Sequence, residues 1–268
     1  MDKLLKEFYI NNIVRNIKSD KFNMNMLLRT KSREVSNILS LLFSPENINL
    51  KAGATIQFSA DIDENGETII LYDNANKTID ENKFWGICLY LLKDYFFEKK
   101  ILLPVSVPRH IEKLAIGHNL SIIYGDTDKA RILNDLSDNK LYNQKRLMTD
   151  AIFFAVSLLD YLNLNNKTFK NLISSIPDAY TSIGRVNNAQ LKESDIIDAV
   201  SGSNTMGLLN FNNGIKVYKD SGWVLIIPEN SEKTITIITE AQSFEAADEL
   251  CFNTIEKIKT CQKEKNSV

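Results

Sequence analysis

The low cysteine count excludes disulfide frameworks and cysteine-based zinc sites. Only three cysteines occur among 268 residues, at Cys88, Cys251 and Cys261, and no two of them form a CxxC pair. Small secreted domains are rich in disulfides, whereas scattered cysteines are typical of core or surface thiols in a reducing compartment. The cysteine content therefore predicts a cytoplasmic protein.

Long apolar runs, strong net charge and flexible linkers are also missing. No apolar run approaches the roughly 20 residues that a membrane-spanning helix needs, and the opening MDKLLKEFYINN carries charges within its apolar pattern, unlike a signal peptide. A net charge of −2 gives no general attraction to nucleic acid. Only five prolines and ten glycines argue against long disordered segments. The length suits one large or two modest domains.

Apolar spacing predicts helices alternating with strands through the first two thirds of the chain, which indicates a parallel-type α/β sheet. Ser32, Asp80 and Thr149 suit the N-caps of three helices, and Pro108 suits the first turn of another. Residues 126–145 are polar and predict an irregular connection. The predicted helices cover residues 1–17, 33–43, 81–95, 108–115, 150–162 and 168–174, and the predicted strands cover residues 22–28, 54–58, 68–72, 101–105 and 121–124.

The last third of the chain predicts an antiparallel hairpin, a further strand and a helix. Residues 215–218 and 223–227 alternate in character and flank the turn Asp220-Ser221-Gly222. A strand at 235–237 follows, and from Ser243 the apolar period becomes helical. Residues 178–212 predict a bridge with one helix near 196–200 and a loop from 202 onward. The charged residues after Thr260 predict a frayed tail.

Three stretches resemble the phosphohexomutases, the family of phosphomannomutase and phosphoglucomutase. They are GIKVYKDSGWVLIIP at 214–228, VSVPRHIEKLA at 105–115 and TDAIFFAVSLL at 149–159. The first is more similar still to the degenerate mutase-like domain fused behind sugar-1-phosphate nucleotidyltransferases, where the hairpin reads D-G-W-V-L-V-L-P. None of the three is a catalytic motif, so the resemblance concerns ancestry more than activity.

The resemblance implies an α/β fold of phosphohexomutase type followed by a C-terminal α+β domain with an antiparallel sheet. Residues 1–50 would form an abbreviated second domain, residues 51–177 a three-layer α/β third domain and residues 178–268 the last domain. The family's phosphoserine lies in a first domain, in a loop similar to T-A-S-H-N-P. No Ser-His pair occurs in this sequence, so the resemblance predicts that the first domain is absent.

The family's metal loop, D-G-D-x-D-R, aligns with Ser59 to Glu64. Asp61 and Asp63 retain two of its three carboxylates, which makes them candidate ligands for Mg²⁺, a cation that prefers oxygen donors. The alternative is an acidic β-turn around Asn65-Gly66, in which both carboxylates are simply solvated. Nothing between residues 124 and 150 resembles the family's sugar-reading G-E-x-S-G-H loop.

The family's phosphate loop, R-P-S-G-T-E-P, aligns with residues 227–233. Ile227 replaces its arginine, whose planar fork would grip two phosphate oxygens. Ser231 and Lys233 are the remaining candidates for phosphate binding, opposed by Glu229 and Glu232. The alternative is an ordinary polar turn between strands.

Two functions fit this erosion of the catalytic parts. The first is a phosphohexomutase-like module without its own catalysis, which binds a sugar phosphate or has a regulatory role. It would act with a sugar-1-phosphate nucleotidyltransferase made as a separate chain. The second is an intramolecular phosphotransferase, motivated by Asp61, Asp63 and Ser231, whose first domain comes from another chain. A remnant that folds and does little is a third. No nucleic acid or membrane partner is expected.

Overall fold

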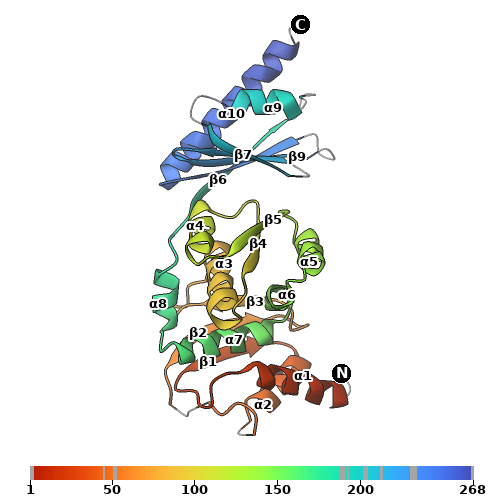
Figure 1. The fold of residues 1–268 in the computed structure, drawn as a ribbon, viewed down its shortest axis with the longest axis vertical. Helices are drawn as coiled ribbons and strands as arrows, with labels where there is room; N and C mark the ends of the chain where they lie inside the picture. Colours follow the sequence, from red (N-terminus) through yellow and green to blue (C-terminus); the bar gives the residue numbers. More distant parts are fainter. Residues whose placement is uncertain are drawn as a thin grey trace. The chain divides into compact units, whose positions relative to one another are not determined.

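The computed structural model describes residues 3–44, 46–50, 53–187, 191, 193–201, 205–211, 214–229 and 234–266 (Figure 1). The chain divides into two compact units. The first comprises Met1–Leu102, Ala115–Ile122 and Leu133–Pro177, and the second comprises Leu103–Leu114, Ile123–Ile132 and Asp178–Val268. The predicted limits of three domains, at residues 50 and 177, stay a prediction.

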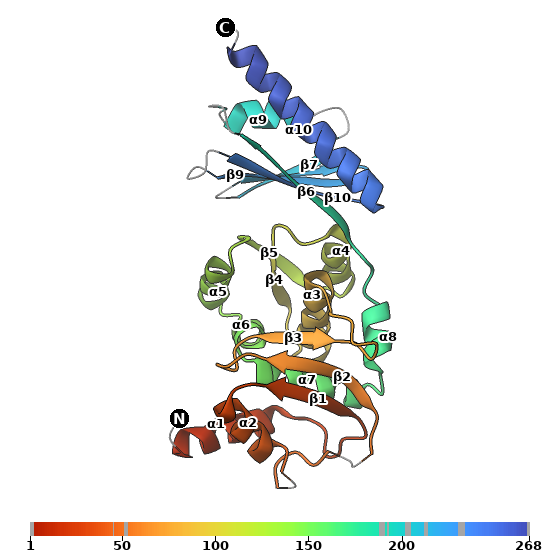
Figure 2. The same ribbon diagram turned by 180° about the vertical axis from the view of Figure 1, so that it is seen from behind.

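A three-stranded sheet organises the first unit. Strand β1 (Asn25–Thr30) pairs in parallel with β2 (Ile56–Ile62), which pairs antiparallel with β3 (Ile69–Tyr72), as Figure 2 shows. Helix α2 (Arg33–Leu42) begins after the predicted N-cap Ser32, whose side chain accepts a hydrogen bond from the Val35 N–H. Its buried apolar side chains recur at three- and four-residue spacing, which is the pattern of a helix with one packed face.

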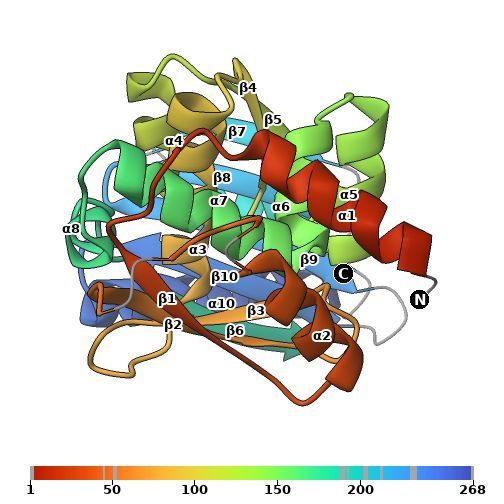
Figure 3. The ribbon, with the colours of Figure 1, turned by 90° about the horizontal axis from the view of Figure 1, so that it is seen from below.

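Helix α7 (Ala151–Leu164) forms the core of the first unit, packing against β2 and against α1 (Lys3–Asn16) (Figure 3). All of its residues from Ala151 to Leu162 are buried, as expected for a helix that is apolar all round. The predicted N-cap is wrong by one position. Asp150 accepts from the Phe153 N–H at 2.9 Å, whereas the Thr149 hydroxyl donates back to the Lys145 carbonyl.

Helices also fill the segment 126–145, where the predicted irregular connection is wrong. Its composition is polar, but Ile132 and Leu136 lie one turn apart and are buried, so a single apolar stripe suffices to hold a helix. The remaining elements of this part of the chain are α3 (Glu81–Tyr90) with a π-helical turn (Leu91–Tyr95), β4 (Lys100–Pro104) paired with β5 (Ser121–Gly125), α4 (Arg109–Gly117), α5 (Lys129–Asp138), α6 (Tyr142–Thr149) and α8 (Phe169–Ser174).

The second unit contains a five-stranded antiparallel sheet in the order β6-β10-β9-β8-β7, with α9 (Glu193–Val200) and α10 (Phe244–Asn266) packed together. The predicted hairpin is confirmed, with Lys219 opposite Gly222 across a two-residue turn. The strands are β6 (Tyr180–Asn187), β7 (Thr205–Phe211), β8 (Gly214–Lys219), β9 (Gly222–Glu229) and β10 (Thr234–Ala241).

Three predictions for the second unit are wrong. The bridge contains strand β6, the loop contains strand β7, and α10 extends to Asn266 instead of fraying after Thr260. Both missed strands are the edges of the sheet, where one side of the backbone is unpaired and a strict alternation of side chains is not needed. The Lys265 amino group lies 2.5 Å from the Asp195 carboxylate, which ties the end of α10 to α9.

The sheet of the second unit is apolar on both faces. Val217, Val224 and Ile237 belong to the cluster beneath α9 and α10, while Trp223 and Leu225 form a second cluster with Val105. The predicted mixed α/β class with an antiparallel C-terminal sheet is therefore confirmed. Among the described residues, no single helix is long and apolar enough to cross a membrane. The helices α6 and α7 together have the required length and apolar composition, but the pair is bent by 110°.

Candidate functional site

The aligned acidic loop begins inside a strand. The sequence predicted that β2 ends at residue 58, but the strand continues to Ile62, so Asp61 is part of the sheet. Its partner in the parallel register is Arg29 on β1, which the predicted strand at 22–28 had left out. Both residues lie near the carboxyl ends of their strands, where side chains of neighbouring parallel strands converge.

Arg29 and Tyr72 occupy both oxygens of the Asp61 carboxylate. The Arg29 Nε donates to Oδ1 at 2.5 Å, and the Tyr72 hydroxyl donates to Oδ2 at 2.8 Å. The guanidinium also lies over the Tyr72 ring, 5.0 Å from its centroid, in a cation–π arrangement. The hydrogen bonds from Arg29 and Tyr72 hold the pKa of Asp61 below its ordinary value. This carboxylate is therefore charged, neutralised and oriented by its own chain.

Asp63 organises the turn between β2 and β3. Its carboxylate accepts from the Glu67 N–H at 2.8 Å, and its carbonyl accepts from the Gly66 N–H, with φ of +79° at Gly66. Partial burial acts to raise the pKa of Asp63, but hydrogen bonds from backbone groups, including the Thr68 and Glu67 N–H, outweigh it, and the pKa is lowered. The alternative reading, an acidic turn containing Asn65-Gly66, describes the geometry of this segment.

The arrangement around Asp61 and Asp63 does not fit a divalent cation. Among the described residues, no three His, Cys, Asp or Glu side chains come together as ligands. A guanidinium already lies against Asp61, and a second cation there would be repelled. A hollow of about 490 Å³ adjoins the pair, with Lys31 and Ile70 among its lining residues, so the surface beside Asp61 is basic and apolar as well as acidic.

The phosphate-binding candidates Ser231 and Lys233 lie outside the described residues. Position 227, where the resemblance places an arginine, is described. Ile227 is on β9, half-buried, and packs against the cluster of Trp223 and Leu225. The side chain at this position thus contributes to an apolar sheet face and offers no donor to a phosphate.

Arg29 and Tyr72 are the residues that sequence reasoning missed at this site. Their roles depend on the register between β1 and β2 and between β2 and β3. A basic residue and an acidic residue at the ends of two predicted parallel strands were the only available signal.

Comparison with known proteins supports the fold but not a narrower identity. No family model matches the sequence, and no curated protein matches it either. Among solved structures, a phosphoglucomutase/phosphomannomutase family protein from Burkholderia thailandensis matches 96% of this chain and 65% of its own length, with a TM-score of 0.71 at 12% identity.

Structures of N-acetylphosphoglucosamine mutase from Aspergillus fumigatus also match. One structure has a TM-score of 0.64 at 11% identity and covers 96% of this chain and 64% of its own. Another, in complex with GlcNAc-6P and magnesium, has a TM-score of 0.58 at 10% identity. It covers 93% of this chain and 68% of its own length. The chain thus spans about two thirds of the length of these mutases. At such identities the likeness establishes a phosphohexomutase-type fold.

Proposed function

We propose that this protein is a phosphohexomutase-like protein that binds a sugar phosphate or regulates carbohydrate metabolism without its own catalysis. The observation that carries the proposal is the ion pair of Arg29 and Asp61, because it fills with a guanidinium the place where the resemblance implies a metal. Phosphoryl transfer needs a divalent cation to neutralise the charge that passes between oxygens, and a fixed arginine on one carboxylate does not supply an open coordination site.

The chemistry elsewhere in the printed sequence agrees with this proposal. Ile227 is packed into a sheet face where an arginine would grip phosphate. The mutase from Aspergillus fumigatus is described in complex with GlcNAc-6P and magnesium, which makes hexose 6-phosphates the first ligands to test here.

The proposal is tested by isothermal titration calorimetry with glucose, mannose and N-acetylglucosamine 1- and 6-phosphates, each with and without Mg²⁺. We expect binding that does not depend on Mg²⁺ and no interconversion of the 1- and 6-phosphates when products are followed by ³¹P NMR. Mg²⁺-dependent interconversion by the purified chain would contradict the proposal. The proposal would also be contradicted if no sugar phosphate bound and the protein had no effect on a partner enzyme.

The regulatory form of the proposal names a separate sugar-1-phosphate nucleotidyltransferase as partner. Its support is the similarity of GWVLIIP at 222–228 to the hairpin of the domain fused behind such enzymes. Adding this protein to a purified nucleotidyltransferase should change its KM for the sugar 1-phosphate. A variant with Gly222→Ala, which disrupts the hairpin, should lose the effect, whereas Gly207→Ala on the edge strand should retain it.

The second candidate is an active mutase portion completed by a first domain from another chain. Asp61 and Asp63 motivate it, because they lie in the loop that aligns with the metal loop. Activity reconstituted with such a domain should be abolished in Asp61→Ala/Asp63→Ala and unchanged in Asp73→Ala, a nearby acidic turn residue. Equal activity in all three proteins would exclude this candidate.

A further inference from the structure

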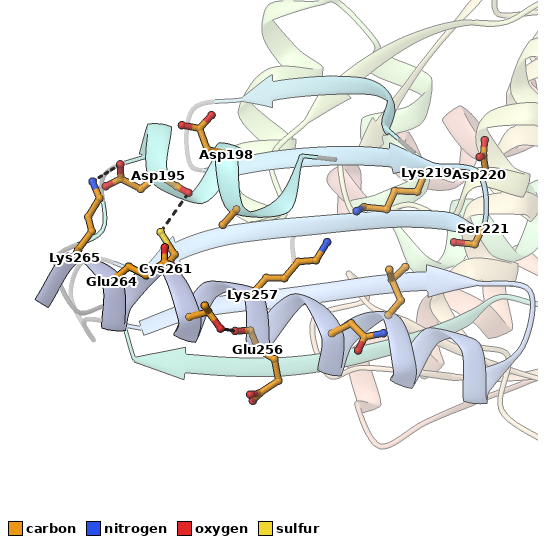
Figure 4. A pocket seen from close by; sticks show the side chains of 14 residues that line it. Asp195, Asp198, Lys219, Asp220, Ser221, Glu256, Lys257, Cys261, Glu264 and Lys265 are labelled. Atoms are coloured by element: carbon orange, nitrogen blue, oxygen red, sulfur yellow. Dashed lines mark hydrogen bonds and ion pairs between the residues drawn. The ribbon is translucent and has the colours of Figure 1, made fainter. Parts of the chain in front are cut away.

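The second unit contains a groove that the sequence analysis did not anticipate. It has a volume of about 1000 Å³ and lies between α9, α10 and the turn that joins β8 to β9 (Figure 4). This volume is at the upper end of what small-molecule sites offer. The described lining residues of the groove extend from the turn between β8 and β9 along α10 to Lys265, and residues 227–229 of the aligned phosphate loop are not among them. The groove is also separate from Asp61, which belongs to the other unit.

Two lysines meet in this groove. Lys219 comes from the end of β8 and Lys257 from α10, and their amino groups point toward one another (Figure 4). The Lys219 Nζ donates to the Val200 carbonyl at the end of α9, with a distance of 3.1 Å. Burial, followed by the charge of Lys257, lowers the pKa of Lys219. In the described part of the chain, neither lysine forms an ion pair.

The acidic side chains that line the groove do not lie between the two amino groups. Asp195 is paired with Lys265 at 2.5 Å, and Glu256 is paired with Lys259 at 2.8 Å. Each of these two carboxylates therefore has a lysine partner of its own. The other acidic residues either point away from the two amino groups in Figure 4 or lie two helical turns farther along α10. They are Asp198, Asp220 and Glu264.

Two ammonium groups that face each other in a partly buried groove repel, and an anion with two negative charges placed between them removes the repulsion. Lysine binds phosphate as a point charge, and several donors improve the fit. Ser221 and Asn253 line the same groove and carry a hydroxyl and an amide. Leu250 and Ala199 add apolar surface for the rest of a ligand. We propose that Lys219 and Lys257 form a binding site for the phosphate group of a small phosphate monoester lying along this groove.

The proposal goes beyond the sugar-phosphate role described above and does not depend on it. Its probe is inorganic phosphate, titrated into the ¹⁵N-labelled full chain at constant ionic strength, with chloride as the reference anion. We expect saturable shifts of the backbone amides of residues 219–222 and 253–260. Binding should weaken as the pH rises through the pKa of Lys219, because the deprotonated amine no longer attracts the anion.

Matched variants on α10 separate a site from general attraction. Lys257→Gln should weaken phosphate binding about tenfold, the factor that corresponds to the loss of one good polar contact, and Lys257→Arg should retain it. Lys259→Gln removes the same charge two residues away, from a side chain that does not line the groove and whose partner Glu256 points away from the two amino groups (Figure 4), and should leave the Kd unchanged. The exposed Lys257 can be replaced without disturbing the core.

Three results would overturn the site. One is the absence of shifts in residues 219–222 and 253–260 at saturating phosphate. Another is equal weakening by Lys257→Gln and Lys259→Gln, which would show attraction to the helix as a whole. The third is equal shifts with chloride. None of these results affects the test of hexose-phosphate binding, which uses the wild-type chain. The groove proposal and the sugar-phosphate proposal therefore succeed or fail separately.

Discussion

Arg29 and Asp61 face each other across the parallel strands β1 and β2, with the guanidinium Nε 2.5 Å from the carboxylate. A carboxylate in this loop has two possible counter-ions, a metal from solution or a cation from the chain. The chain provides its own, and the Tyr72 hydroxyl occupies the second carboxylate oxygen. Both oxygens of the Asp61 carboxylate therefore have donors from the chain itself.

The first prediction concerns magnesium. Mg²⁺ should leave the melting temperature of the wild-type chain unchanged, because a ligand that does not bind the folded state cannot stabilise it. Arg29→Gln frees one oxygen of Asp61, but only two of the three carboxylates of the family's metal loop are retained, so it should gain at most weak binding. Differential scanning fluorimetry with and without Mg²⁺ checks both proteins. A Mg²⁺-dependent stabilisation of the wild type that Asp61→Asn removes would contradict the prediction.

The same ion pair gives a pH dependence. The folded-state pKa of Asp61 is lowered, so the pair contributes stability that is fully present above the unfolded pKa, and this contribution is lost as pH falls through the folded pKa. Arg29→Gln should therefore flatten the acid limb of a plot of stability against pH. Urea unfolding at a series of pH values below neutrality measures this effect, and Lys21→Gln, which lies outside both paired strands, is the control.

A further prediction distinguishes two neighbouring residues at the start of α7. Asp150→Ala should destabilise the protein by about 1–2 kcal/mol, since it removes the N-cap and also the acceptor of the Tyr9 hydroxyl, 2.6 Å away. Thr149→Ala should cost much less, because its hydroxyl bonds only to a helical carbonyl that is already paired. Urea unfolding of both variants measures the two losses in the free energy of unfolding. Equal losses would restore Thr149 as the cap.

The wrong assignment of that N-cap shows which features of the structure can be predicted from the sequence and which cannot. Thr149 and Asp150 are both good N-cap residues, and only the backbone geometry distinguishes them. The spacing of apolar residues made α2, α7 and the β8–β9 hairpin predictable. The edge strands β6 and β7 lacked it, because an edge strand is constrained on one side only. The residues around Asp61 were hidden for another reason: the meeting of Arg29, Asp61 and Tyr72 depends on strand register, a non-local property.

The hairpin contains a glycine that no other residue can replace without a backbone shift. A Cβ on Gly222 would lie 1.7 Å from the Glu240 carbonyl oxygen on the neighbouring strand. Gly222→Ala should therefore destabilise the second unit by about 1–3 kcal/mol, the usual cost of overpacking. Gly207→Ala on β7 is the matched control, because its Cβ would meet only the Tyr218 ring at 3.9 Å. Thermal unfolding followed by Trp223 fluorescence in a Trp85→Phe background measures both, and equal stability of the two variants would contradict the prediction.

The last prediction concerns a buried ion pair in the second unit. The Lys216 amino group lies 2.8 Å from the Glu112 carboxylate, with side-chain exposures of 0% and 7%, and also donates to the Val107 carbonyl. The Tyr218 hydroxyl donates to the same carboxylate. Both charges are thus removed from water, and each is tolerated only because the other is present.

Removing one partner of this pair should cost more than removing both. Lys216→Met leaves the Glu112 charge buried and unpaired, and should destabilise the unit by about 3–5 kcal/mol. Lys216→Met/Glu112→Gln should recover much of that loss, because the amide can still accept from Tyr218 and no charge remains. Lys216 lies 4.4 Å from the centroid of the Trp223 ring, so urea unfolding in a Trp85→Phe background reports on this unit alone. Additive losses in the double-mutant cycle would show that the two charges are not coupled, and would assign the cost to packing of the Lys216 stem instead.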